Sequence, residues 1–161
     1  MVLLRVDDAN STLVGTSLDD LLCGDERANS IRGGDGNDLL CGFQGDDTLV
    51  GNKGDDILFG GQDDDLLIGS KGNDTADGEA GNDRVIGGTA SERKTDPNGQ
   101  DTLFGGSGDD DLFGSEANDT LSGGSGDDDL NGGIGSDTCD GGDSPDEDDI
   151  TVYCEAVPTV P

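Results

Sequence analysis

The chain repeats one nine-residue unit, which reads GGDGNDLLC at Gly33–Cys41, GGSGDDDLF at Gly105–Phe113 and GGSGDDDLN at Gly123–Asn131. Slots one, two and four of this unit are rich in glycine, slot six is acidic and slot eight is aliphatic. All 30 glycines of the chain occupy slots one, two and four of a single frame that runs from Gly15 to Gly142. A short fixed period of this kind indicates a coil that repeats its own geometry.

Each slot has a predicted structural role. The glycines permit positive φ values and leave carbonyl groups free to turn inward. The unit therefore predicts a six-residue turn followed by a three-residue strand. Side chains alternate between the two faces of a strand, so slot eight points inward and slots seven and nine point outward. Successive coils then lie about 4.8 Å apart in a parallel sheet.

The composition shows that this coil needs a neutralising partner. The 161 residues include 38 acidic and 8 basic side chains, a net charge of −30, only 29% hydrophobic residues and no histidine. Low hydrophobicity with high net charge is typical of chains that do not fold alone. Two like charges about 4 Å apart repel by about 4 kcal/mol at an effective dielectric constant of about 20. Small cations are the simplest partner for stacked carboxylates.

The acidic slot points to calcium. Calcium takes six to eight oxygen ligands at about 2.3–2.6 Å from carboxylates and carbonyls, whereas magnesium requires a tighter octahedron and keeps its waters. A purely solubilising surface explains the charge, but not why the acid recurs two residues after the slot-four glycine. Slot-five residues such as Asp55, Asp64 and Asp109 are expected to form turns rather than to bind metal. The predicted metal ligands in slot six are Asp20, Asp38, Asp47, Asp56, Asp65, Asp74, Asp83, Asp101, Asp110, Asp119, Asp128 and Asp137.

With these motifs, the stretch from Gly15 to Asp146 resembles the RTX, or haemolysin-type, calcium-binding repeat proteins. The resemblance implies an all-β fold, a right-handed parallel β-roll solenoid with two nonapeptide repeats per coil, which folds on binding several Ca²⁺ ions, about ten here. It also implies that slot-six aspartates two repeats apart share an ion. These pairs are Asp38 with Asp56, Asp56 with Asp74, Asp47 with Asp65, Asp65 with Asp83, Asp110 with Asp128 and Asp119 with Asp137. The degenerate repeat Gly24–Arg32 departs from the motif, and we expect a weak ion or none there.

The chain divides into a roll with an extension at each end. Residues 1–14 and 147–161 are expected to be an N-terminal cap and a C-terminal strand and cap, because solenoid ends need cover. Residues 15–146 form the roll. Within it, Lys94 would occupy an inward slot, where an unpaired ammonium group is costly to bury. We therefore expect 89–98 to be an inserted loop, either a tolerated surface insertion or a binding loop.

Four cysteines complete the pattern. Cys23 and Cys41 both occupy slot nine, two repeats apart, and the two-repeat coil makes them neighbours about 4.8 Å apart. We predict a Cys23–Cys41 disulfide, and a Cys139–Cys154 disulfide that closes the C-terminal end, since disulfides accept Cα separations of about 4.4–6.8 Å. The alternative is four free or buried thiols. Oxidised pairs would favour an extracellular location, secreted or at the cell surface.

Several functional classes are disfavoured by the composition. Nucleic acid binding requires clusters of lysine and arginine, and no apolar run approaches the roughly 20 residues of a spanning helix, so we expect neither nucleic-acid binding nor membrane insertion. Without histidine the chain has no Ser-His-Asp arrangement, and its abundant carboxylates already belong to the repeat. We expect a non-catalytic calcium-binding module.

The outward slots suggest an alternative, namely a calcium-dependent adhesion, surface-layer or filament-forming protein. Outward residues toward the N-terminus are largely apolar, and such a face is a candidate for self-assembly. Cover by the N-terminal cap, or scattered exposure of single side chains, would account for this pattern equally well. The apolar outward residues are Leu21, Leu39, Val50, Ile57, Phe59, Ile68 and Ile86.

Overall fold

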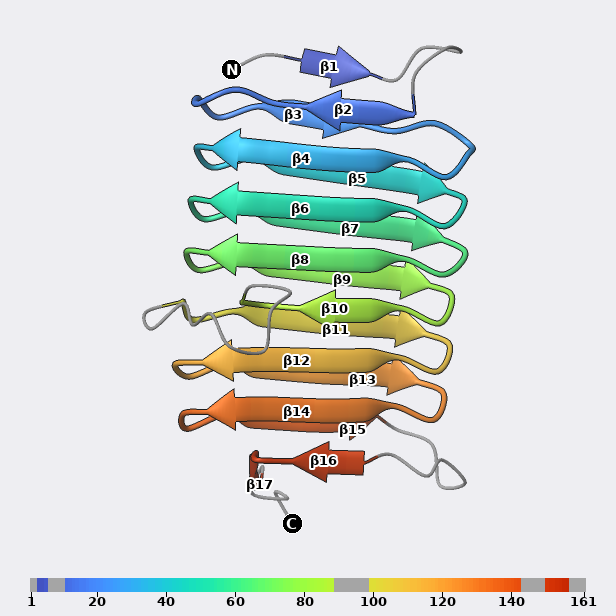
Figure 1. Ribbon diagram of the computed structural model, residues 1–161. Coiled ribbons are helices and arrows are strands. Elements are labelled where there is room, and N and C mark those ends of the chain that lie inside the picture. The colour runs from blue at the N-terminus through green and yellow to red at the C-terminus, as the bar shows by residue number, and fades with distance from the viewer. Residues whose placement is uncertain (1–2, 6–10, 89–98, 143–149, 157–161) are drawn as a thin grey trace.

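The structure is a computed structural model that describes residues 3–5, 11–88, 99–142 and 150–156. These residues form an all-β parallel solenoid of about seven turns, with about 18 residues per turn. Two parallel sheets run along its length, one on each side of a single core (Figure 1). The predicted fold class is confirmed. The described residues contain no helix, and thus none long and apolar enough to cross a bilayer.

The strands alternate between the two sheets along the chain. Sheet A pairs the odd-numbered strands in order: β1 (Leu3–Arg5), β3 (Leu21–Cys23), β5 (Leu39–Gln44), β7 (Ile57–Gln62), β9 (Thr75–Ala80), β11 (Thr102–Ser107), β13 (Thr120–Ser125), β15 (Thr138–Gly142) and β17 (Glu155–Ala156). Sheet B pairs the even-numbered strands: β2 (Thr12–Val14), β4 (Ser30–Asp35), β6 (Thr48–Lys53), β8 (Leu66–Lys71), β10 (Arg84–Ile86), β12 (Asp111–Glu116), β14 (Asp129–Ile134) and β16 (Ile150–Val152).

The register shows where the repeat is interrupted. Leu58 pairs with Leu40 in the preceding coil, an offset of 18 residues. The offset rises to 27 residues where Leu103 pairs with Ala76 and where Leu112 pairs with Val85. One coil therefore contains nine extra residues. The predicted loop at 89–98 lies outside the described residues.

Most strands are twice as long as expected. β5 covers slots seven to nine of one repeat and slots one to three of the next, and the other complete strands do the same. The prediction of a three-residue strand is therefore wrong. In the complete strands the slot-two residues adopt positive φ, which bends the strand. Adjacent coils bend at the same place, so Phe43 still pairs with Gly61. The bend stays within the parallel ladder instead of ending it.

The core is a single row of aliphatic side chains between the two sheets. All the slot-eight residues are buried, and most have no exposed surface. They are Leu22, Ile31, Leu40, Leu49, Leu58, Leu67, Ala76, Val85, Leu103, Leu112, Leu121, Leu130 and Cys139, with Leu13 at the N-terminal end. One medium-sized side chain per repeat is a thin core, so apolar burial alone gives this fold limited stability.

Of the two predicted disulfides, one is confirmed. Cys139 of β15 is bonded to Cys154, which follows β16, with a Cα–Cα distance of 5.7 Å. The Cys23–Cys41 disulfide is wrong, because both residues are free thiols although they pair in register. Side chains in register on parallel strands run side by side about 4.8 Å apart. Disulfides prefer a Cβ–Cβ distance of about 3.5–4.5 Å.

The outward apolar residues do not form one uniform surface. Ile68 and Ile86 of sheet B are only 6% and 8% exposed, whereas Ile57 of sheet A is 42% exposed. Nothing in the described residues supports self-assembly through this face.

The core row gives a direct test of packing. Leu58→Ala should lower the free energy of unfolding by about 2–5 kcal/mol, because it leaves a cavity in a closely packed row. The adjacent outward change Ile57→Thr should alter it by less than about 1 kcal/mol, since Thr75 occupies the same slot in the next coil. Urea denaturation of both variants in one buffer measures the difference. Equal effects would contradict the assignment of slot eight to the core.

The cysteine assignment is tested by alkylation. In denaturant without reductant, iodoacetamide should modify Cys23 and Cys41 only, and all four cysteines should react after reduction. Peptide mass spectrometry reads out the modified positions. Protection of Cys23 and Cys41 before reduction would show that they are bonded after all.

Candidate metal centres

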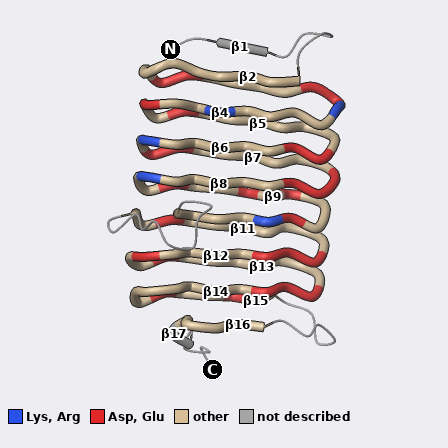
Figure 2. The backbone as a smooth tube through the Cα atoms, in the orientation of Figure 1, with Lys and Arg blue, Asp and Glu red and all other residues tan. Residues whose placement is uncertain are grey.

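The slot-six side chains form two buried rows, one beside each sheet. Each residue directly precedes a strand, where the turn brings its side chain back into the coil, and each is at most 5% exposed. Figure 2 shows acidic residues concentrated at the turns on both edges of the solenoid. The row beside sheet A contains Asp20, Asp38, Asp56, Asp74, Asp101, Asp119 and Asp137, and the row beside sheet B contains Asn29, Asp47, Asp65, Asp83, Asp110 and Asp128.

One carboxylate oxygen of each aspartate along these rows is used by the backbone. The backbone N–H of Asp38 donates to Oδ1 of Asp56 at 2.8 Å, and that of Asp56 donates to Oδ1 of Asp74 at 2.9 Å. The same bond joins every predicted ion-sharing pair. It also joins four aspartate pairs that were not predicted. Two of them, Asp20 with Asp38 and Asp101 with Asp119, are 18 residues apart. The other two, Asp74 with Asp101 and Asp83 with Asp110, are 27 apart because of the extra residues. The rows are therefore continuous through the interrupted coil.

The second oxygen has no partner. Oδ2 is buried and accepts no hydrogen bond in ten of the aspartates. An unpaired buried carboxylate oxygen is strongly destabilising unless a cation or a donor reaches it. The ten residues are Asp38, Asp47, Asp56, Asp65, Asp74, Asp83, Asp110, Asp119, Asp128 and Asp137.

The slot-one glycines leave the space beside these oxygens open. A Cβ added to Gly60 would lie 2.5 Å from Oδ2 of Asp65 and 2.8 Å from the carbonyl oxygen of Gly78 in the next coil. A side chain is therefore excluded there. The carboxylate oxygen and the carbonyl oxygen both face the same small space, and this arrangement repeats along both rows.

Burial without a cation perturbs the acidity of these carboxyl groups. Desolvation by burial raises the pKa of Asp56, Asp65 and Asp110 to about 7. Neighbouring aspartates raise these pKa values further, while the backbone N–H bond to Oδ1 lowers them. Burial likewise raises the pKa of Asp47 and Asp83 to about 6. The protein itself leaves much of the negative charge of these groups uncompensated.

The first two repeats are different. Oδ2 of Asp20 accepts bonds from the N–H and the hydroxyl of Thr16 at 2.7 and 2.8 Å. Oδ1 of Asn29 accepts the N–H of Asp25 at 2.7 Å. Protein groups therefore satisfy these two slot-six side chains, in contrast to the ten aspartates whose Oδ2 accepts no hydrogen bond.

Slot-five side chains form separate ladders on the outside of the turns. The N–H of Asn73 donates to Oδ1 of Asp55 at 2.9 Å, and the N–H of Asp127 donates to Oδ1 of Asp109 at 3.0 Å. These bonds run in the opposite direction to those of slot six. The sequence predicts turns at slot five, but it did not lead us to predict the hydrogen-bond ladder between slot-five residues. The recurrence of Asp or Asn next to slot six is the signal that could have indicated this ladder.

The chemistry available is oxygen coordination between coils. Among the residues that the structure describes, no three Asp, Glu, Cys or His side chains converge on one point. A cation in these rows would therefore need backbone carbonyls as well as carboxylates. Hard divalent cations that accept many oxygens fit such a donor set.

Comparison with protein families identifies the repeat. The model of the RTX calcium-binding nonapeptide repeat matches residues 14–42, 42–76, 59–90, 98–121 and 113–147, most of the chain. This chain belongs to the RTX calcium-binding repeat family. The family implies Ca²⁺ as the cation, and its repeat modules are generally non-catalytic. RTX repeat proteins are typically secreted, and the disulfide is consistent with that. Comparison with curated proteins gave no match.

The raised pKa values predict how the metal-free protein responds to pH. In the folded state six slot-six aspartates bind protons with pKa values of about 6–7, whereas an aspartate has an ordinary pKa of 3.8. These six are Asp47, Asp56, Asp65, Asp83, Asp110 and Asp119. Stability from these groups is therefore fully present below about pH 4 and is lost as the pH rises through 6–7. In EDTA, lowering the pH from 8 to 5 should increase the β signal in circular dichroism. A loss of β structure on acidification would contradict the buried rows.

Proposed function

We propose that this RTX repeat chain is a non-catalytic calcium-binding module that folds when several Ca²⁺ ions enter the two rows of turns. The observation that supports it best is the set of ten buried Oδ2 atoms without a partner, each facing a slot-one glycine. The chain has a net charge of −30 and only one core residue per repeat, so neither basic side chains nor apolar burial can offset the cost of these buried oxygen atoms. Calcium accepts both the carboxylate and the carbonyl oxygens that border this space.

The proposed ligands are the twelve slot-six aspartates from Asp20 to Asp137, together with backbone carbonyls of the glycine-rich turns. Aspartates in adjacent coils, such as Asp38 and Asp56, share an ion, and about ten ions bind in total. The continuous ladder adds Asp74 with Asp101 and Asp83 with Asp110 to the shared pairs. The Asp20 position binds weakly, because Oδ2 of Asp20 already accepts hydrogen bonds from Thr16. The Asn29 position binds weakly or not at all, because its Oδ1 accepts the N–H of Asp25.

An extracellular location suits this function. Extracellular calcium modules bind at dissociation constants of about 10⁻⁴–10⁻³ M. Such a chain stays unfolded where calcium is scarce and folds where calcium is in the millimolar range. The Cys139–Cys154 disulfide supports an oxidising environment.

A calcium titration tests the proposal. Circular dichroism at pH 7.5 should show a disordered chain in EDTA and a β-rich protein in millimolar CaCl₂, with about ten ions bound by calorimetry or native mass spectrometry. Magnesium at the same concentration should not replace calcium. An unchanged β spectrum in excess EDTA would refute folding coupled to calcium.

Adjacent carboxylates offer a matched pair of variants. Asp55→Asn and Asp56→Asn remove the same charge one residue apart. Asp55 is exposed and its Oδ1 caps Asn73, whereas Oδ2 of Asp56 is buried and unpaired. Asp56→Asn should therefore weaken two neighbouring sites, while Asp55→Asn should keep the stoichiometry. Equal losses in both variants would show that calcium responds to overall charge and not to the slot-six rows.

A further inference from the structure

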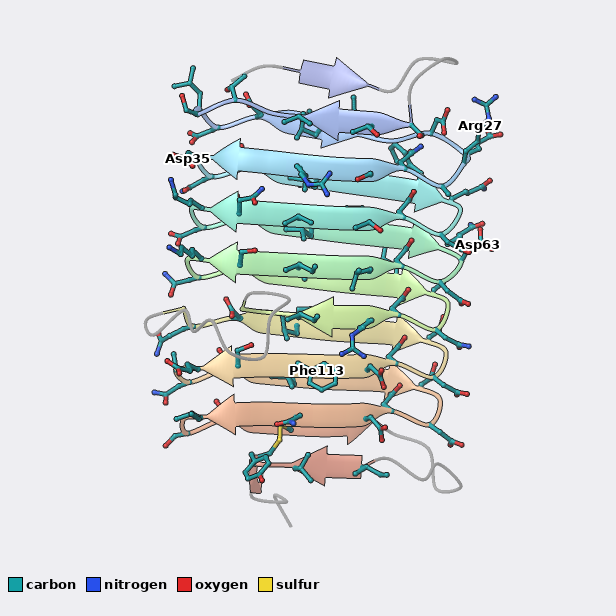
Figure 3. The ribbon with its side chains drawn as sticks, in the orientation of Figure 1. Arg27, Asp35, Asp63 and Phe113 are labelled. Carbon is teal, nitrogen blue, oxygen red and sulfur yellow. A yellow bond between two sulfur atoms is a disulfide. The ribbon has the colours of Figure 1, made fainter. Side chains whose placement is uncertain are left out.

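A groove of about 1140 Å³ is lined by residues of sheet A and of the turn after β3, none of which belongs to slot six. Residues of four successive coils line it, and Phe43, Phe59 and Cys41 provide aromatic and apolar surface. Arg27, which projects from the turn after β3, borders one end (Figure 3). The groove is large enough for a peptide side chain with its flanking backbone, since ligand sites commonly measure about 300–1,000 Å³.

Two bulky residues in strained positions shape this groove. In the complete strands slot two has positive φ, and most of these positions hold glycine or a small polar residue. Phe43 (φ 91°) and Glu79 (φ 73°) are the large exceptions, and they flank Gly61 in the same column of sheet A. Phe43 and Glu79 are two strands apart, and neighbouring strands are about 4.8 Å apart, so their backbone positions are about 10 Å apart. A side chain at Gly61 is excluded by the carbonyl oxygen of Phe43, so the space between them stays open.

The far wall of the groove carries the Glu79 carboxylate. Asp77 of β9 does not line the groove but lies next to it, because it pairs in register with Phe59 and its Oδ1 accepts the N–H of Glu79 at 3.1 Å. Burial raises the pKa of Asp77. Neither Asp77 nor Glu79 forms an ion pair within the described part of the chain, and Arg27 lies 3.6 Å from a different carboxylate, that of Asp25. A positively charged group would therefore complement this wall.

The opposite sheet shows which cation such a surface accepts. On the outer face of sheet B, the guanidinium carbon of Arg84 lies 4.6 Å from the centroid of the Phe113 ring. The same guanidinium group forms a 3.0 Å ion pair with Asp111. Phe113 lies on the face of β12 seen in Figure 3. The groove on sheet A presents the Phe43 ring and the Glu79 carboxylate, while Arg27 at its edge pairs with Asp25.

We infer that this groove binds an extended basic peptide, with an arginine side chain of the partner between the Phe43 ring and the Glu79 carboxylate. The planar guanidinium stacks on the ring while its N–H groups donate to the carboxylate. The flanking backbone of the peptide lies over the apolar surface of Phe59 and Cys41. This inference does not depend on the proposed calcium function, because none of the groove's carboxylates belongs to slot six.

Nitrogen-15 NMR of the full chain in saturating calcium and 150 mM salt tests the inference. The probe is a capped pentapeptide with a central arginine between two leucines, and the control replaces arginine by citrulline, which has the same shape without the charge. Amide shifts should concentrate at Phe43, Gly61 and Glu79. The citrulline peptide should bind about tenfold more weakly. Shifts spread along the exposed aspartates, or no saturable binding, would overturn the inference.

Variants separate the groove from general attraction to an acidic protein. Phe43→Gly introduces glycine, the residue most common at slot two, so the fold should persist. The affinity for the arginine peptide should fall about tenfold, because the aromatic ring is lost. Glu79→Gln should weaken binding about fivefold. The control Phe104→Ser removes another exposed ring of sheet A, which lies outside the groove. Serine is tolerated at this register position, because Ser122 pairs with Phe104 in the next coil. The affinity of this variant for the arginine peptide should not change. Unchanged binding by Phe43→Gly, or an equal loss in Phe104→Ser, would overturn the inference.

Discussion

The stacking of buried carboxylates is the constraint on which this molecule depends. Each coil brings a slot-six side chain to within one strand spacing of the next, and the backbone satisfies Oδ1 but not Oδ2. The repulsion within such a row is of the order of several kcal/mol per pair, and a core of one aliphatic residue per repeat offers little to offset it. In the proposed function, divalent cations between the coils turn this repulsion into attraction. Folding and metal binding are therefore one event in the proposed function.

The glycine pattern and the metal rows are parts of one design. Slot-one glycine keeps the space beside the carboxylate free of a side chain, as at Gly60. Slot two provides the positive φ that bends the strand without ending its ladder. Slot five caps the backbone of the neighbouring coil from outside, as Asp55 does for Asn73. Each nonapeptide thus supplies one carboxylate, one open space and one core side chain, and two nonapeptides complete a coil.

The nine-residue period made the solenoid fold, the core row and most of the slot-six pairs predictable from the sequence. The errors concern details that the period does not determine, such as strand length and the direction of individual side chains. The inward slot eight and the slot-six pairs follow from counting residues, because a solenoid converts sequence spacing into register. Counting alone did not give the pairing of Asp74 with Asp101, since extra residues change the offset. It placed Cys23 beside Cys41 correctly, but side-by-side parallel side chains do not favour a disulfide. The groove beside Phe43 was not foreseen, because it arises from two exceptions to the pattern.

The decisive measurement is anomalous diffraction from crystals grown in calcium, or in terbium as a heavier substitute. Two rows of peaks are expected between successive coils, each close to Oδ2 of a slot-six aspartate such as Asp56 or Asp65, with weak or absent peaks at Asp20 and Asn29. A structure with those spaces empty and the ions bound only to exposed carboxylates outside the turns would contradict the proposed role of the buried rows.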